Sequence, residues 1–286
     1  MIELIFTDQE ECYQVRKKIC NQASLKQMNP SFVEVLHTDP HILHIKSFEH
    51  MNVIIDIVAG YIQDKVEEDH LLYLIENVFF FKDKEEQQEI LVIAKSIMNG
   101  EIEDIPGTSS MVPGEQLIKK ELSKLFLENR RKFTIDSFIQ FRLKDYFQQL
   151  LMYVEWAIDE YKMELEYQSF IDHLRTCVST YQTKVNAIHV TFDGEIRIYD
   201  EVLNPFSSEK LEKMYEKALV MTEELDLDRI LLGPLLGISP KMIYFYSNEA
   251  DHAIVHTIQN IFEERLIHQP LSSFAALKQR INSSKT

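Results

Sequence analysis

The chain of 286 residues contains only seven glycines. None of the patterns G-x-G-x-x-G, a P-loop or G-x-S-x-G can be written from their positions. These patterns build the common phosphate cradles and the nucleophile elbow. The sequence therefore implies no cofactor, and no motif in it identifies a reaction.

Long uninterrupted apolar runs are also missing. The longest, at residues 51–62 and 71–81, are interrupted by Asp56 and Glu76. Both fall short of the roughly 20 residues that a helix needs to cross a bilayer. We therefore expect no transmembrane helix and no membrane partner.

Cysteine is scarce, and its spacing is uninformative for disulfides. Cys12, Cys20 and Cys177 form neither a C-x-x-C pair nor an even framework, which is typical of a reducing compartment. The first residues, MIELIFTDQEEC, do not place a cationic leader before an apolar stretch, so they do not indicate a signal peptide. We expect a cytoplasmic protein.

Positive charge is in deficit. Lys and Arg number 30 against 46 Asp and Glu, which gives a net charge of −16. Such an acidic chain disfavours nonspecific binding to nucleic acid, although a local basic patch can still bind it. The hydrophobic fraction of 45% and the charged fraction of 27% are typical of a folded globular protein.

The segment at residues 100–114, GEIEDIPGTSSMVPG, holds three of the seven glycines and two prolines. Glycine and proline mark turns and linkers. The sequence thus predicts an amino-terminal strand and helix domain at 1–99, a linker at 100–114, and a helical arm with an α/β layer at 115–286.

The amino-terminal domain is predicted to begin with a strand at residues 2–6, followed by a helix from Asp8 to about Met28. Residues 41–48 indicate a second strand. The pattern then becomes helical as far as Asn99, in three segments. We place the two separations near Val66 and near Phe81.

A long helix is predicted to begin at Thr134, as the N-cap, with Phe133 and Phe138 as a hydrophobic staple. Two apolar stripes then occupy roughly opposite faces of the same ideal helix. We therefore predict helices at 135–164 and 167–181 with a break near 165–167. The first stripe is Leu143, Phe147, Leu150, Val154, Ile158, Tyr161 and Leu165, and the second is Phe170, Ile171, Leu174, Val178 and Tyr181.

A β-hairpin is predicted at residues 185–200, with Phe192, Asp193 and Gly194 as its loop. This loop places glycine at a left-handed position. The register that follows pairs Val190 with Ile196.

The remaining sequence predicts a helix from about Ser208 to Leu225 and a short helix around Pro234. KMIYFY, at 241–246, is apolar on both faces, as an interior strand is. A helix capped by Asn248 and a strand at 265–268 complete a β-α-β unit at 241–268, and the final residues are predicted to be frayed. The predicted fold is α+β and helix-rich, with a C-terminal mixed sheet.

The segment FRLKDY, at 141–146, contains the first candidate site residues, Arg142, Lys144 and Asp145. Arg142 and Asp145 are three residues apart on the polar face of the predicted helix. They can form a surface ion pair with no further role, or belong to an interaction surface.

A basic segment at residues 118–144 carries eight Lys or Arg and three acids, a net charge of +5. With Arg130, Arg131 and Lys132, it can form a docking surface for an acidic partner or a track for nucleic-acid phosphates. The alternative is that its helices pack beside the acidic stretch at 155–172.

Two histidine groups are candidate metal sites. One is His37, Asp39, His41 and His44, and the other is the pair His252 and His256. The pair lacks the glutamate of H-E-x-x-H and is predicted to face solvent. We assign no metal residue from the sequence.

Several segments resemble the YtxC-like family, named for a sporulation protein of endospore-forming bacteria. The likeness is most specific at SFIQFRLKDY (137–146), AIDEY (157–161) and EYQSFI (166–171), and it extends to 79–94 and to SPKMIYFY. HLRTCVS, at 173–179, keeps Leu174, Arg175 and Val178 of the family pattern and lacks its aromatic residues. The resemblance implies a setting in sporulation and supplies no catalytic residue.

The sequence thus favours a non-enzymatic interaction protein with an unknown protein partner. A nucleic-acid-associated protein that uses the basic segment is the alternative, and an enzyme of unrecognised type is a third. Arg142, Lys144, Asp145, Arg130, Arg131 and Lys132 are the predicted interaction residues, with no catalytic, cofactor-binding or metal residue.

Overall fold

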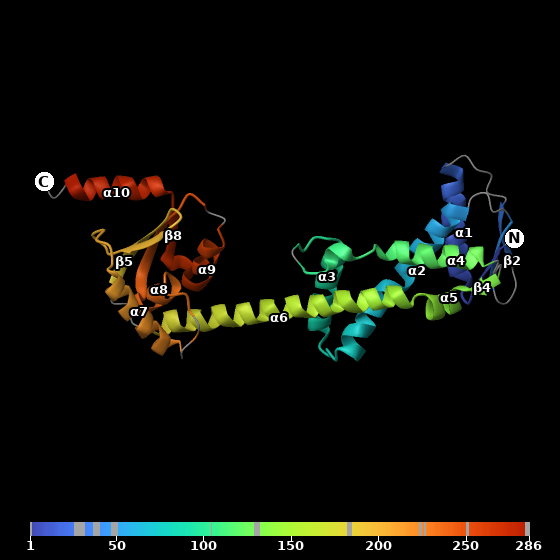
Figure 1. Cartoon of the computed structure of the whole chain (residues 1–286), viewed down its shortest axis with the longest axis horizontal. Coiled ribbons are helices and arrows are strands. Elements are labelled where there is room, and N and C mark those ends of the chain that lie inside the picture. The colour runs from blue at the N-terminus through green and yellow to red at the C-terminus, as the bar shows by residue number, and fades with distance from the viewer. Residues whose placement is uncertain are drawn as a thin grey trace. The chain divides into compact units, whose positions relative to one another are not determined.

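A computed structural model describes residues 2–25, 32–36, 41–46, 51–103, 105–128, 132–181, 185–222, 225, 227–249 and 252–283. The chain packs as two compact units, Met1–Met163 and Glu164–Thr286 (Figure 1). Across the described part of the chain, no helix combines the length and the apolar composition that crossing a membrane requires. The α+β, helix-rich class predicted from the sequence is confirmed.

The first unit contains a four-stranded sheet with strand order β2-β3-β1-β4. The strands are β1 (Ile2–Phe6), β2 (Val33–Leu36), β3 (His41–Ile45) and β4 (Lys132–Thr134). β1 is antiparallel to β3 and parallel to β4, with Leu4 opposite both Leu43 and Phe133. The two predicted strands are confirmed, whereas β2 and β4 were not predicted.

The helices of the first unit are α1 (Gln9–Leu25), α2 (Met51–Tyr73), α3 (Lys84–Met98), α4 (Gly114–Leu127) and α5 (Ile135–Arg142), with a π-helical segment η2 (Leu74–Val78) and a short 3-10 helix η3 (Thr108–Ser110). The predicted separation near Phe81 is confirmed, and Asp83 caps α3 there. The separation near Val66 was wrong. Ile62 and Leu71, on either side of this point, are buried in the same core, and Val66 packs against it, so α2 continues from Met51 to Tyr73.

The predicted linker at 100–114 lies inside the first unit. Ile105 belongs to the core of this unit, and Gln149 donates a hydrogen bond to the carbonyl of Val112 at 2.7 Å. The division between compact units falls within α6 (Lys144–Thr180) and not in this glycine- and proline-rich segment.

The predicted break at 165–167 was wrong, because α6 is continuous from Lys144 to Thr180. Apart from the exposed Leu165 and Tyr181, the first apolar stripe packs into the core of the first unit and the second into that of the other unit. No single core therefore has to receive both faces. The helix is interrupted earlier, at Leu143, between α5 and α6. Thr134 caps α5 as predicted, and the Phe133 and Phe138 ring centroids lie 5.9 Å apart.

The second unit has a mixed sheet of order β6-β5-β7-β8. Its strands are β5 (Val185–Phe192), β6 (Ile196–Tyr199), β7 (Pro240–Tyr246) and β8 (Leu266–Gln269). β7 is parallel to both β5 and β8, and α9 (Ala253–Phe262) with a 3-10 turn η4 (Glu263–Arg265) connects β7 to β8. The predicted interior strand and β-α-β unit are confirmed, but α9 is capped by His252 and not by Asn248.

The hairpin exists, but its predicted register was wrong. Val190 pairs with Ile198 and Phe192 with Ile196, so the loop is formed by residues 193–195. The shift of two residues adds a pair to the ladder and keeps Val190 and Ile198 on the buried face. Gly194 has a φ of 91°, as a left-handed loop position requires.

Helices cover both faces of this sheet. α7 (Ser208–Met221), α8 (Leu232–Ile238) and α9 lie on one side, and α10 (Leu271–Ser283) lies on the other (Figure 1). The short helix at Pro234 is confirmed. The predicted fraying was wrong for residues 279–283, because α10 is helical as far as Ser283. The Phe274 ring of this helix packs against Tyr199 and Tyr246.

Candidate functional site

The turn between α5 and α6 brings the end of α4 close to the predicted residues of FRLKDY. Arg142 Nη2 lies 3.0 Å from Glu128 Oε2 at the end of α4. The residues that precede Glu128 and Arg142 in the sequence are large, apolar and exposed: Leu127 has 85% of its surface exposed and Phe141 has 73%. We define the junction surface as Leu127, Glu128, Phe141, Arg142, Lys144 and Asp145.

The other residues of this turn hold the surface in place. Leu143 is buried at the interruption between the helices, and its carbonyl accepts a hydrogen bond from the Phe147 amide at 3.0 Å. Tyr146 is buried and donates to Glu67 Oε2 at 2.7 Å. Burial and this carboxylate raise the pKa of the Tyr146 phenol, so the phenol stays protonated as the donor. FRLKDY thus alternates buried anchors with outward-facing side chains.

The ion pair predicted between Arg142 and Asp145 does not form. Arg142 ends α5 and turns to Glu128, whereas Asp145 lies in the first turn of α6 and is exposed. The interruption at Leu143 breaks the continuous helix on which the i, i+3 spacing depended. Arg142 and Asp145 line one small cleft of about 10 Å³, which is room for about one water molecule and excludes a small-molecule ligand.

The remaining predicted interaction residues are not all brought to this turn. Lys144 is exposed at the start of α6. Lys132 lies on β4 and pairs with Glu3 of β1 at 3.1 Å. Arg130 and Arg131 lie outside the described residues.

Much of the basic segment is neutralised within the first unit. Lys119 pairs with Asp56 at 2.8 Å, and Lys124 pairs with Glu121. The ion-pair partners of its described residues come from α2, α4 and β1. The predicted packing against the acidic stretch at 155–172 therefore supplies none of these pairs, because the acids lie closer in the fold.

The two histidine groups do not converge in the part of the chain that the structure describes. His44 pairs with Glu3 at 3.0 Å, and His37 and Asp39 lie outside the described residues. His252 is the N-cap of α9, where its Nδ1 accepts from the Ile254 amide, and His256 is exposed. Within the described ranges, no three His, Cys, Asp or Glu side chains gather closely enough to hold a metal ion.

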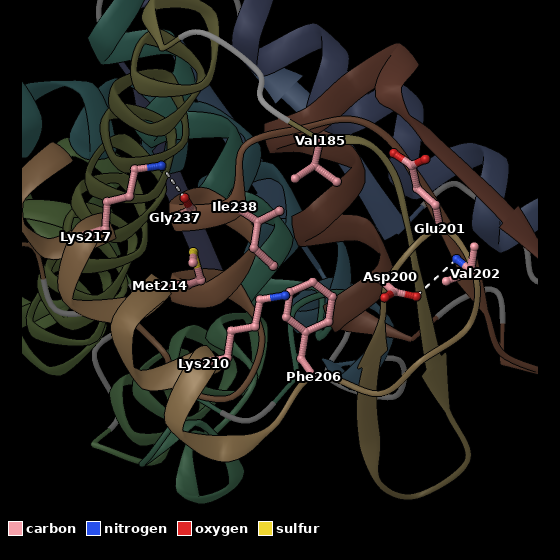
Figure 2. Close-up of a pocket in the computed structure, with 10 residues that line it drawn as sticks. All are labelled: Val185, Asp200, Glu201, Val202, Phe206, Lys210, Met214, Lys217, Gly237 and Ile238. Carbon is pink, nitrogen blue, oxygen red and sulfur yellow. Dashed lines mark hydrogen bonds between the residues drawn. The ribbon is translucent and has the colours of Figure 1, made fainter.

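The second unit contains a cavity that the sequence gave no reason to expect. We call it the α7 cavity; its volume is about 550 Å³ (Figure 2). Apolar side chains come from β5, the turn after β6, α7 and α8. The lining residues are Val185, Asp200, Glu201, Val202, Phe206, Lys210, Met214, Lys217, Gly237 and Ile238.

Two lysines of α7 reach the cavity. The ammonium of Lys210 lies 4.2 Å from the centroid of the Phe206 ring, a cation–π contact. Lys217 donates to the carbonyl of Gly237 at 2.5 Å (Figure 2). A Cβ at Gly237 would lie 1.8 Å from the Met214 carbonyl oxygen, so only glycine permits this close approach of α7 and α8.

The two carboxylates of the cavity are engaged by the chain itself. Asp200 accepts from the amides of Val202 and Asn204, at 3.0 and 2.8 Å. Although burial works against it, these donors hold the pKa of Asp200 below its usual range. Glu201 Oε1 accepts from the amides of Asn186 and Ala187 at the start of β5.

Comparison with known proteins places the chain in a family. The sequence profile of the YtxC-like family matches residues 52–267. The chain belongs to the YtxC-like family. The uncharacterized protein YtxC of Bacillus subtilis (strain 168) is 38% identical over 218 residues, which cover 76% of this chain and 76% of that protein. No solved structure shows a significant match.

Both candidate sites lie inside the YtxC-like region. The junction surface and the α7 cavity fall within residues 52–267, whereas β1, β2, β3 and α10 fall outside that range. The resemblance seen in FRLKDY is thus confirmed as family membership. No biochemical activity comes with it.

The YtxC-like region also contains a strained turn, residues 79–83, which we call the Phe80 turn. Phe80 has a φ of 64° and is 72% exposed. A bulky residue in the left-handed region is an outlier and carries a steric cost. The buried Gln87 holds the turn by donating to the Phe81 carbonyl at 2.7 Å. In the sequence, only the run FFF at residues 79–81 marks this segment, and it does not predict a positive φ at Phe80.

Proposed function

We propose that this YtxC-like protein is a non-enzymatic cytoplasmic interaction protein that acts in sporulation, and that the junction surface binds a partner protein. The observation that carries the proposal is the exposure of Leu127 and Phe141 beside the Arg142–Glu128 ion pair. Protein interfaces commonly combine an aromatic anchor with a polar rim.

Packing within the first unit does not account for these two side chains. The neighbouring Leu143 and Tyr146 supply the buried contacts of the turn. Phe141 lies in the last turn of the capped helix α5, with most of its ring in solvent. Burial against a partner would remove apolar surface from water at about 25 cal/mol per Å².

The charged residues near Phe141 support selective binding of a partner. Among the described residues, Lys144 and Asp145 have no ion-pair partner, and both are exposed. Charged groups at the rim of an interface contribute more to specificity and association rate than to affinity. We infer that a partner presents an apolar pocket with charges of both signs around it.

Composition and family support the proposed setting. Cys12, Cys20 and Cys177 form no disulfide with one another, as in a reducing compartment. Family membership, the similar protein in Bacillus subtilis and the family's name support a role in sporulation.

The test is quantitative affinity capture from sporulating cells, with the wild-type chain and Phe141→Ala compared side by side. We expect Phe141→Ala to reduce the retained partner at least about tenfold, as loss of an interface hot spot does. Val92→Ala is the matched control, because Val92 is an apolar residue of the same unit that is 60% exposed.

The double variant Arg142→Ala/Asp145→Ala tests the rim. We expect its melting temperature to stay within a few degrees of wild type, since an exposed ion pair contributes about 0–1 kcal/mol. The same set of proteins retained by wild type, Phe141→Ala and Val92→Ala would contradict the proposal.

A further inference from the structure

We propose that the α7 cavity binds a small organic anion with an apolar body, such as a medium-chain carboxylate. The volume of about 550 Å³ lies in the range of small-molecule sites, roughly 300–1,000 Å³. Val185, Phe206, Met214 and Ile238 provide apolar walls. An apolar body of this size would contact side chains of β5, α7 and α8 in the second unit.

The expected charge of the ligand depends on which charged side chains of the cavity are already engaged within the chain. Asp200 and Glu201 already accept hydrogen bonds from backbone amides. Their carboxylates shape the turn after β6 and the start of β5. A cationic ligand would have to compete with these bonds.

Lys210 is in the opposite situation. In the described part of the chain, no carboxylate lies within ion-pair distance of its ammonium, which rests over the Phe206 ring. Asp200 acts on it only at longer range. A ligand anion can accept from Lys210 while its apolar body contacts Phe206, so one contact satisfies the ammonium and buries the ring.

The helix places a second ammonium on the same side. Lys210, Met214 and Lys217 are spaced i, i+4 and i+7, so they share one face of α7. Figure 2 shows them along one wall, with Asp200 and Glu201 on the opposite side. Approach of an anion is therefore favoured from the α7 side, with Met214 between the two lysines as an apolar contact.

The experiment is a fluorescence titration of the full chain with anilinonaphthalene sulfonate, an aromatic anion with an apolar body. We expect saturable binding to one site and displacement by decanoate. Lys210→Gln should weaken the affinity about tenfold, the loss expected for a charge-assisted hydrogen bond. Lys213→Gln is the matched control, because Lys213 lies on α7, pairs with Glu209 and does not line the cavity.

A second variant tests whether the probe binds in the α7 cavity and not elsewhere on the protein. Val202→Glu adds a carboxylate to an exposed position of the cavity wall and should weaken the probe by repulsion without unfolding the protein. Circular dichroism checks the fold of each variant. The proposal is overturned by absence of saturable binding, by unchanged affinity in both Lys210→Gln and Val202→Glu, or by displacement with decanol as effective as with decanoate.

Discussion

The two halves of α6 bury apolar side chains on different faces of the helix, each in the core of a different unit. In the first half, Leu150, Val154 and Ile158 are buried in the core of the first unit. In the second half, Leu174 and Val178 are buried in the core of the second unit. The apolar stripe changes phase near Leu165 while the helix continues. A phase change in a helical pattern can therefore mark a change of core as well as the end of a helix.

The halves also differ in how polar groups fix them. The first half is tied by Tyr146 to Glu67 and by Gln149 to the Val112 carbonyl, both at 2.7 Å. In the second half, Arg175 Nε donates to the Asn260 carbonyl at 2.6 Å. Buried or half-buried polar contacts of this kind specify one arrangement of neighbours, because leaving either partner unsatisfied is costly.

The largest effect is expected from removing one buried leucine from each half. Leu150→Ala and Leu174→Ala should each cost about 2–5 kcal/mol, since both side chains are almost fully buried. If the two cores are separate, each variant lowers the protection of amides from hydrogen exchange only in its own unit. Peptide-resolved hydrogen exchange measures this directly.

Met163→Ala is the control for both leucines, because Met163 is exposed at the end of the first unit. It should change protection in neither unit. Equal loss of protection in both units from either leucine variant would contradict two separate cores.

The next effect tests the continuity of α6. Leu165→Pro should cost about 3 kcal/mol, because proline inside a helix removes a hydrogen bond and collides with the preceding turn. Leu165→Ala should be nearly neutral, since Leu165 is half exposed. Circular dichroism and exchange of the flanking amides report the difference. Equal tolerance of proline and alanine would restore the break that the sequence pattern predicted.

Local features of this fold were predictable, and features that depend on distant packing were not. The Thr134 cap and the Phe133–Phe138 staple rest on residues within one turn, and both were found. The partner of Arg142 is Glu128, fourteen residues away, and only the tertiary fold brings the end of α4 close to the end of α5. The three-residue strand β4 is likewise defined by its pairing with β1.

The candidate site follows the same rule. Its residue types could be read from FRLKDY, but the pairing of Arg142 with Glu128 required the interruption at Leu143 and the position of the end of α4 to be known. The α7 cavity is lined by residues of four segments between β5 and α8, so no local sequence pattern predicts it.

The smallest effect concerns two left-handed turn positions, one in each unit. Gly194 of the second unit has a φ of 91°, and Phe80 of the first unit has a φ of 64°. Phe80→Gly should raise the free energy of unfolding of the first unit by about 0.5–1 kcal/mol, because it relieves the strain and loses only an exposed ring. Phe80→Ala keeps the Cβ, and therefore the strain, so it should give no such gain. Thermal and denaturant unfolding distinguish the two variants, and equal stability of glycine and alanine would show that the turn is unstrained. A gain with Phe80→Gly would mean that the first unit keeps an exposed aromatic ring at a cost in stability, as residues retained for binding often do.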